Sequence, residues 1–117
     1  MLLRILTVFL FVVCISDMHA QQKWVQFFVD GLSSEEDSRA IESYIASHEG
    51  IASVRAESVN GNLLIFIKEN FSYSEDTMRE WIGQAGFHAW CYRGGVQGVN
   101  PIRRISRQEC QPLEQKK

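Results

Sequence analysis

The residues of this chain best suited to chemistry are carboxylates gathered at the start of a predicted helix. They surround the turn that begins at Gly31: Asp30, Glu35, Glu36 and Asp37. Carboxylate oxygens are the ligands that hard cations such as Ca²⁺ prefer. Acidic side chains in a first helical turn also complement the helix dipole without any ligand. We therefore expect solvated carboxylates here, and at most a weakly bound metal ion as cofactor.

Three cysteines offer thiol chemistry. Cys14 lies in an apolar N-terminal run, whereas Cys91 and Cys110 lie in the body of the chain. For an exported protein we expect Cys91 and Cys110 to form a disulfide. The alternative is a pair of free thiols for metal or redox chemistry, which no CxxC spacing supports.

The other soft ligands do not gather in the sequence. His48 and Met78 fall on two different predicted helices, and His88 falls on a strand. His88 and Cys91 share that strand, but their odd separation predicts that they point to opposite faces. No spacing of Ser, His, Asp or Cys suggests an activated nucleophile. We assign no catalytic residue and expect a protein that is not an enzyme.

The N-terminal residues have the layout of a secretory signal peptide. One positive charge at Arg4 precedes an apolar run over residues 5–15, and residues 18–20 end on the small Ala20. The run is too short to span a bilayer. We expect cleavage after Ala20, no membrane association afterwards, and a periplasmic or secreted protein. A lipid-modified Cys14 is the alternative, but bulky valines precede it.

Charge is spread unevenly along the remaining chain. Residues 21–95 carry six basic and eleven acidic side chains, whereas residues 96–117 carry five basic and two acidic ones. Nucleic-acid binding depends mostly on clustered Lys and Arg. An acidic body with a short basic tail therefore predicts no nucleic-acid partner.

Hydrophobic periodicity predicts six elements in one domain. Alternating apolar residues predict strands over residues 24–30, 52–59, 62–68 and 87–93. Helices are expected to begin at Ser33 or Ser34 and near Ser72 or Ser74, and to stop before Gly50 and Gly86. Ser33 and Glu36 have the spacing of a capping box, and Asn60-Gly61 suits a tight hairpin turn.

The order β-α-β-β-α-β predicts an α+β ferredoxin-like sandwich over residues 21–95, with two helices on one face of a four-stranded antiparallel sheet. Residues 96–117 form a C-terminal tail that we expect to be partly disordered.

The region over residues 25–89 resembles the heavy-metal-associated domains of copper chaperones and metal-transporting ATPases. The resemblance rests on glycine and apolar positions that match in register: Gly31-Leu32, Ile41, Gly50-Ile51, Val54 and residues 85–89. In that family two cysteines bind Cu(I) or Zn(II) at the start of the first helix, and here Ser34 and Asp37 stand in their places. Neither residue type suits a soft ion. The resemblance therefore implies the fold but a degenerate metal site.

The second face of the predicted sheet is unusually aromatic. Strand alternation directs these residues away from the helices: Trp24, Phe28, His88, Trp90 and Tyr92. Their neighbours, with Cys91 among them, face the helices, and one of the pairs Leu64/Phe66 or Leu63/Ile65 joins the aromatic face. An apolar patch of this size is rarely left exposed. We expect it to be covered by the tail, held by a Cys91–Cys110 bond, or by a second copy or another protein.

Two functions follow from these features. The first is an exported, non-catalytic interaction module that has lost the cysteine metal site, with a homodimer or an unknown protein as partner. The alternative is a metal-binding or metal-homeostasis protein that uses non-standard ligands.

Overall fold

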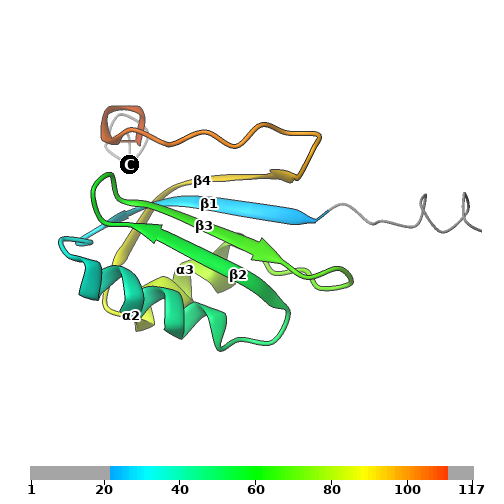
Figure 1. Cartoon of the computed structure of the whole chain (residues 1–117), viewed down its shortest axis with the longest axis horizontal. Helices are drawn as coiled ribbons and strands as arrows, with labels where there is room; N and C mark the ends of the chain where they lie inside the picture. Colours follow the sequence, from blue (N-terminus) through cyan, green and yellow to red (C-terminus); the bar gives the residue numbers. More distant parts are fainter. Residues whose placement is uncertain (1–21, 111–117) are drawn as a thin grey trace, which may run out of the picture.

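The computed structural model describes residues 22–110 and folds them into a sheet covered by two helices. The elements follow one another as β1 (Lys23–Asp30), α2 (Glu35–Ala46), β2 (Ile51–Glu57), β3 (Asn62–Ile67), α3 (Glu75–Gln84) and β4 (His88–Val96). The strands are antiparallel in the order β2-β3-β1-β4, and both helices lie on one face (Figure 1). This arrangement confirms the predicted ferredoxin-like sandwich. The predicted signal segment and the last seven residues of the tail lie outside the described residues.

The main core fills the space between the helices and the sheet. Helical spacing directs Ile41 and Ile45 of α2, and Met78 and Ile82 of α3, toward the strands. The strands meet them with alternate residues: Val25, Phe27, Val29, Leu63, Ile65 and Ile67. The open choice between the β3 pairs is thereby decided, because Leu63 and Ile65 face the helices.

Two strand boundaries differ from those expected. β2 ends at Glu57, and a four-residue turn over residues 58–61 replaces the expected two-residue turn. Gly61 still takes the positive φ of 74°, and its N–H donates to the Glu57 carbonyl at 2.8 Å. β4 continues through Gly94 and Gly95, which pair with β1 although glycine usually weakens a strand. Gly95 is accommodated because the Trp24 ring packs on it, where an added Cβ would approach within 2.7 Å.

A β-bulge in β4 overturns two of the predicted side-chain directions. Phe27 pairs with Tyr92 and Phe28 pairs with Trp90, so Cys91 is an extra residue between them. One inserted residue reverses the alternation of all the residues beyond it. Tyr92 therefore lies on the helix side, with its ring centroid 5.4 Å from that of Phe27. Cys91, expected on the helix side, instead packs with Phe28 on the other face.

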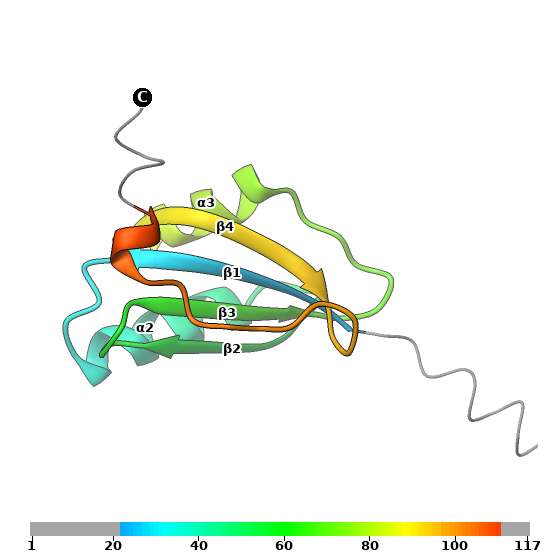
Figure 2. The ribbon, with the colours of Figure 1, turned by 90° about the horizontal axis from the view of Figure 1, so that it is seen from above.

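The predicted open face is covered by the chain's own tail. After β4, residues 97–110 run back over β1 and β3 and end in a helical turn near the start of β4 (Figure 2). We call these residues the strap. Beneath it Trp24 is 1% and Phe28 8% exposed, so neither is available at the surface. His88 remains exposed at the rim, beside Trp90.

Candidate functional site

The turn before α2 is closed by its own hydrogen bonds. Ser34 is the N-cap, and its Oγ accepts a hydrogen bond from the Asp37 N–H at 3.2 Å. The Asp37 carboxylate accepts two more, from the Ser33 N–H at 3.1 Å and the Ser33 Oγ at 2.9 Å. The reciprocal cap thus joins the Ser33-Ser34 pair to Asp37, and the expected pairing of Ser33 with Glu36 is wrong. The two positions where the resembling family has cysteines serve here as a helix cap.

The acidic cluster of this turn is dispersed among separate partners. Asp30 lies 3.7 Å from Arg107, and Glu35 lies 3.8 Å from Arg39. Within residues 22–110, no three His, Cys, Asp or Glu side chains come close enough together to hold a metal ion.

Hydrogen bonding alters the acidity of Asp37. The backbone N–H and then the hydroxyl of Ser33 stabilise the carboxylate and hold the Asp37 pKa below its ordinary value of 3.8. A lowered pKa means that the unfolded chain takes up the proton first as the pH falls. The stabilisation by this cap is therefore fully present above pH 3.8 and is lost as the pH falls through the folded-state pKa.

We expect Asp37→Asn to lower the unfolding free energy near neutral pH and to have no effect in strong acid, where the wild-type carboxyl is protonated. Urea unfolding of both proteins over a range of pH measures the difference. Glu36→Gln is the control, since it removes a charge from the same helical turn without touching the Ser33 bonds. A loss equal in both variants would assign the effect to the helix dipole instead.

The soft ligands His48, Met78 and His88 lie in different parts of the fold, but His88 and Cys91 share one face of the sheet. The expectation that they point to opposite faces is wrong, because the bulge turns Cys91 to the side of Phe28 and Trp90, and the His88 ring lies 5.4 Å from that of Trp90. The His48 ring stacks on Trp81 with centroids 4.0 Å apart, and its Nδ1 lies 3.1 Å from the Tyr44 carbonyl at the end of α2. Met78 is fully buried in the main core. Cys91 and Cys110 form the expected disulfide, with Cα atoms 5.5 Å apart.

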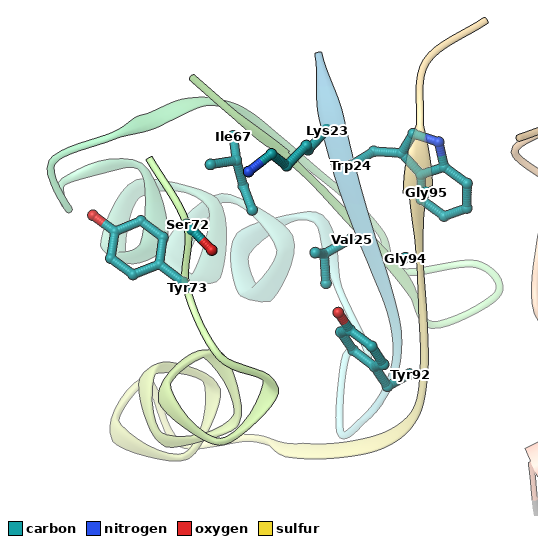
Figure 3. Close-up of a pocket in the computed structure, with 9 residues that line it drawn as sticks. All are labelled: Lys23, Trp24, Val25, Ile67, Ser72, Tyr73, Tyr92, Gly94 and Gly95. Carbon is teal, nitrogen blue, oxygen red and sulfur yellow. The ribbon is translucent and has the colours of Figure 1, made fainter. Parts of the chain in front are cut away.

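A pocket of about 340 Å³ opens at the other end of the sandwich, between the sheet and the segment before α3 (Figure 3). Val25 and Tyr92 point into it from β1 and β4, while the Trp24 ring points away toward Gly95. Lys23 is the one charged residue among those that line it, and its Nζ donates to the Phe71 carbonyl at 3.3 Å. Tyr92, which the bulge turns to the helix side, forms a wall of this space rather than part of the aromatic face.

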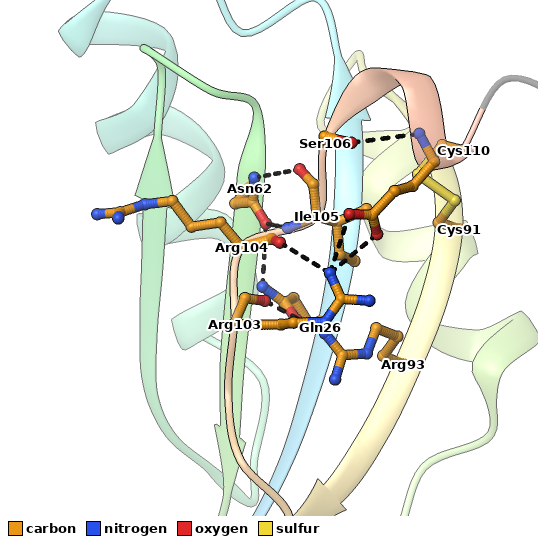
Figure 4. Close-up of polar contacts among 10 residues, drawn as sticks. Gln26, Asn62, Cys91, Arg93, Arg103, Arg104, Ile105, Ser106 and Cys110 are labelled. Carbon is orange, nitrogen blue, oxygen red and sulfur yellow. Dashed lines mark hydrogen bonds and ion pairs between the residues drawn. A yellow bond between two sulfur atoms is a disulfide. The ribbon is translucent and has the colours of Figure 1, made fainter.

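The strap is held to the sheet by a buried amide that the sequence analysis did not single out. The Asn62 side chain accepts from the Ile105 N–H at 2.6 Å and donates to the Ile105 carbonyl at 2.8 Å (Figure 4). Gln26 Nε2 donates to the same Asn62 oxygen at 2.9 Å. Both amides are nearly fully buried. By alternation Gln26 and Asn62 fall on the sheet face away from the helices, where a polar residue is ordinary unless something covers it. Their burial therefore gave no signal in the sequence, although a buried amide needs partners.

Apolar contacts and ion pairs complete the attachment of the strap. Ile105 is 2% exposed and packs with Phe28 and Cys110 in a second, smaller core. Arg104 lies 3.0 Å from Glu57. Burial raises the pKa of Glu57, but hydrogen bonds from Asn60 and Arg104 outweigh it and leave the pKa below its ordinary value of 4.5. The carboxylate is therefore a charged partner for the strap at neutral pH.

Within residues 22–110, no helix is both long and apolar enough to cross a bilayer.

Comparison with known proteins identifies the fold alone. No protein-family model and no curated protein matches the chain. Among solved structures, the CopZ metallochaperone aligns with a TM-score of 0.52 and 20% identity, over 56% of this chain and 97% of that one. A copper-binding domain from HMA7, a P-type ATPase, aligns with a TM-score of 0.51 and 18% identity, over 65% of this chain and 95% of that one.

A third structure extends the likeness to bacterial ATPases. The N-terminal domain of a potential copper-translocating P-type ATPase from Bacillus subtilis, in its Cu(I)-loaded state, gives a TM-score of 0.52 and 16% identity, over 72% of this chain and all of that one. Identities this low establish similarity of fold and not of activity. The chain thus has a fold like that of the heavy-metal-associated metallochaperones and ATPase metal-binding domains.

Proposed function

We propose that this chain is an exported, non-catalytic interaction module on a heavy-metal-associated-like fold without the cysteine metal site. The observation that carries the proposal is the turn before α2. Ser34 and Asp37 use their oxygens to cap the helix. Hydroxyl and carboxylate oxygens are poor ligands for Cu(I), which selects thiolates and thioethers. The fold neighbours named for copper support the scaffold, and the family resemblance implies cysteines at the two positions where this chain has Ser34 and Asp37.

The remaining parts of the proposal rest on the sequence and on the covalent bond of the strap. A signal-peptide layout over residues 1–20 supports export, and the Cys91–Cys110 disulfide is compatible with an oxidising compartment. We propose a periplasmic or secreted location. As the partner we propose another protein or a second copy of the chain.

The test is a metal-loading experiment in which the missing site is rebuilt. The mature protein and a Ser34→Cys/Asp37→Cys variant are incubated with Zn(II) or Ag(I), which need no reductant and so leave the native disulfide intact. After desalting, we expect less than a tenth of an equivalent on the wild type and about one equivalent on the variant, since a helix N-terminus lowers the pKa of a thiol and favours the metal-binding thiolate.

The matched control is Ser34→Ala/Asp37→Ala, which changes the same positions without offering a ligand. One equivalent of metal on the wild-type protein would overturn the proposal and favour a metal-binding protein with non-standard ligands. Loss of that metal in the alanine control would then place those ligands at this turn.

A further inference from the structure

We propose that the sheet face beneath the strap is a docking groove for an extended basic segment with one β-branched aliphatic residue. The chain fills this groove with its own residues 103–110, and the Cys91–Cys110 bond locks them in. The inference deepens the proposed interaction function and rests on it, because it names the chemistry of the partner and the bond that controls access.

The first element of recognition is a backbone clamp. Asn62 bonds both the N–H and the carbonyl of Ile105, at 2.6 and 2.8 Å, as a neighbouring strand would. Gln26 holds the Asn62 oxygen in place from β1. Main-chain bonds of this kind recognise an extended conformation and not a particular side chain. A segment from another molecule can therefore make the same two bonds.

The second element is a single apolar position. Ile105 and Cys110 are the buried strap residues, whereas residues 97–104 and 106–109 are exposed. The Ile105 side chain packs on Phe28, with Trp90 at the side. A compact β-branched chain fills this space, so the apolar part of the groove selects one aliphatic residue.

The third element is charge. Glu57 lies 3.0 Å from Arg104 and Asp30 lies 3.7 Å from Arg107, so one ion pair comes before Ile105 in the strap and one comes after it. Exposed ion pairs contribute little to affinity, but they favour basic partners and speed their association. The acidic body of the chain extends this preference. A partner segment therefore carries basic residues one position before and two positions after its aliphatic residue.

The disulfide fixes the far end of this occupant. Cys91 is the bulge residue of β4 and takes a φ of 42°, which turns its side chain toward the strap. A bond that closes a loop with a separation of 19 residues suppresses opening by roughly a hundredfold on the loop-entropy account. Without it the strap remains tethered at an effective concentration on the order of millimolar. A partner segment then competes when its own concentration or its affinity for the groove offsets this local concentration.

A dithiol reductant performs the release. Its thiolate attacks the sulfur of Cys91, because Cys91 is the less buried residue of the two. The Cys110 sulfur leaves as a thiolate and takes up a proton. The second thiol of the reductant then attacks the mixed disulfide and frees the Cys91 thiol. Two electrons pass to the protein, and the reductant ends as a disulfide.

The binding experiment uses a fluorescein-labelled peptide with the sequence of residues 101–109. Its anisotropy is followed with the oxidised mature protein and with a Cys91→Ser/Cys110→Ser/Ile105→Asp variant, whose own strap has neither lock nor apolar anchor. We expect binding to the variant at least tenfold tighter than to the oxidised protein. The same peptide carrying Ile105→Asp is the matched control, and we expect it not to bind. Adding Glu57→Gln to the variant should slow the association of the original peptide.

Two outcomes overturn the proposal. Equal binding to the oxidised protein would place the peptide outside the groove, and no binding to a variant with a native circular dichroism spectrum would make the strap a permanent cover.

A second measurement needs no variant: trypsin should cleave after Arg103, Arg104 or Arg107 roughly a hundredfold faster once dithiothreitol is added. Unchanged cleavage contradicts the lock. If the protein binds the peptide and also retains Zn(II), the proposal of a module without a metal site is overturned, but the proposal of a docking groove still holds.

Discussion

Replacing Asn62 with leucine should destabilise the protein by about 3 kcal/mol, because buried hydrogen-bonding groups would lose their partner. Leucine has a similar size but offers neither donor nor acceptor. The N–H and carbonyl of Ile105 and the amide of Gln26 would all lose the bonds they now make with Asn62. The intact disulfide keeps Cys110 in place, so the strap cannot swing fully into water to recover those bonds. The midpoint of thermal unfolding should fall by about 15 °C for a domain of this size.

Asn100→Ala is the matched control for this prediction. Asn100 also lies in the strap region and accepts a hydrogen bond from the Val96 N–H at 3.0 Å, but the pair is exposed. Water replaces an exposed bond, so we expect a loss of no more than about 1 kcal/mol. Equal losses in the two variants would show that the buried clamp contributes nothing special. Urea unfolding with the disulfide intact measures both.

Gly50→Ala should also cost about 3 kcal/mol, for two separable reasons. Gly50 joins α2 to β2 with a φ of 87°, a backbone conformation that side chains with a Cβ rarely adopt. An added Cβ would also lie 2.9 Å from the Phe71 Cβ and closer still to its ring. Phe71 packs on the main core, so it cannot move away without losing contacts.

Gly86→Ala separates the two reasons. Gly86 has a similar φ of 96°, but no atom lies within 4 Å of the added Cβ. We expect this variant to lose only the backbone contribution, about 1–2 kcal/mol. Chemical unfolding measures the loss of unfolding free energy in each variant, and the difference between the two losses is the cost of the clash with Phe71. A difference near zero would mean that the segment around Phe71 yields without cost.

The order and type of the six elements were predictable because local signals agreed. Apolar alternation, helical spacing and the glycines at 31, 50, 61 and 86 each pointed to the same β-α-β-β-α-β chain. Every one of these glycines takes a positive φ in the structure. The choice between Leu63/Ile65 and Leu64/Phe66 was not predictable, because β3 is apolar at five successive positions and both of its faces are covered.

The functional surface was less predictable because it depends on contacts between distant residues. Asn62 and Ile105 are separated by 43 positions. In the sequence Asn62 reads as the residue after a hairpin turn and Ile105 as one of several apolar tail residues. Only burial in the folded structure distinguishes Ile105, which anchors the strap, from Val99, which is 61% exposed.

The sequence by itself determined the fold and the absence of the cysteine pair, because residue types and local periodicity act within each element. Only the tertiary structure decided which residues share a face and what covers them. One extra residue at Cys91 reverses the alternation of β4, turning Tyr92 toward the helices and Cys91 toward Cys110. No local pattern marks that bulge, since it forms where the pairing of two distant strands must accommodate both the helix core and the strap.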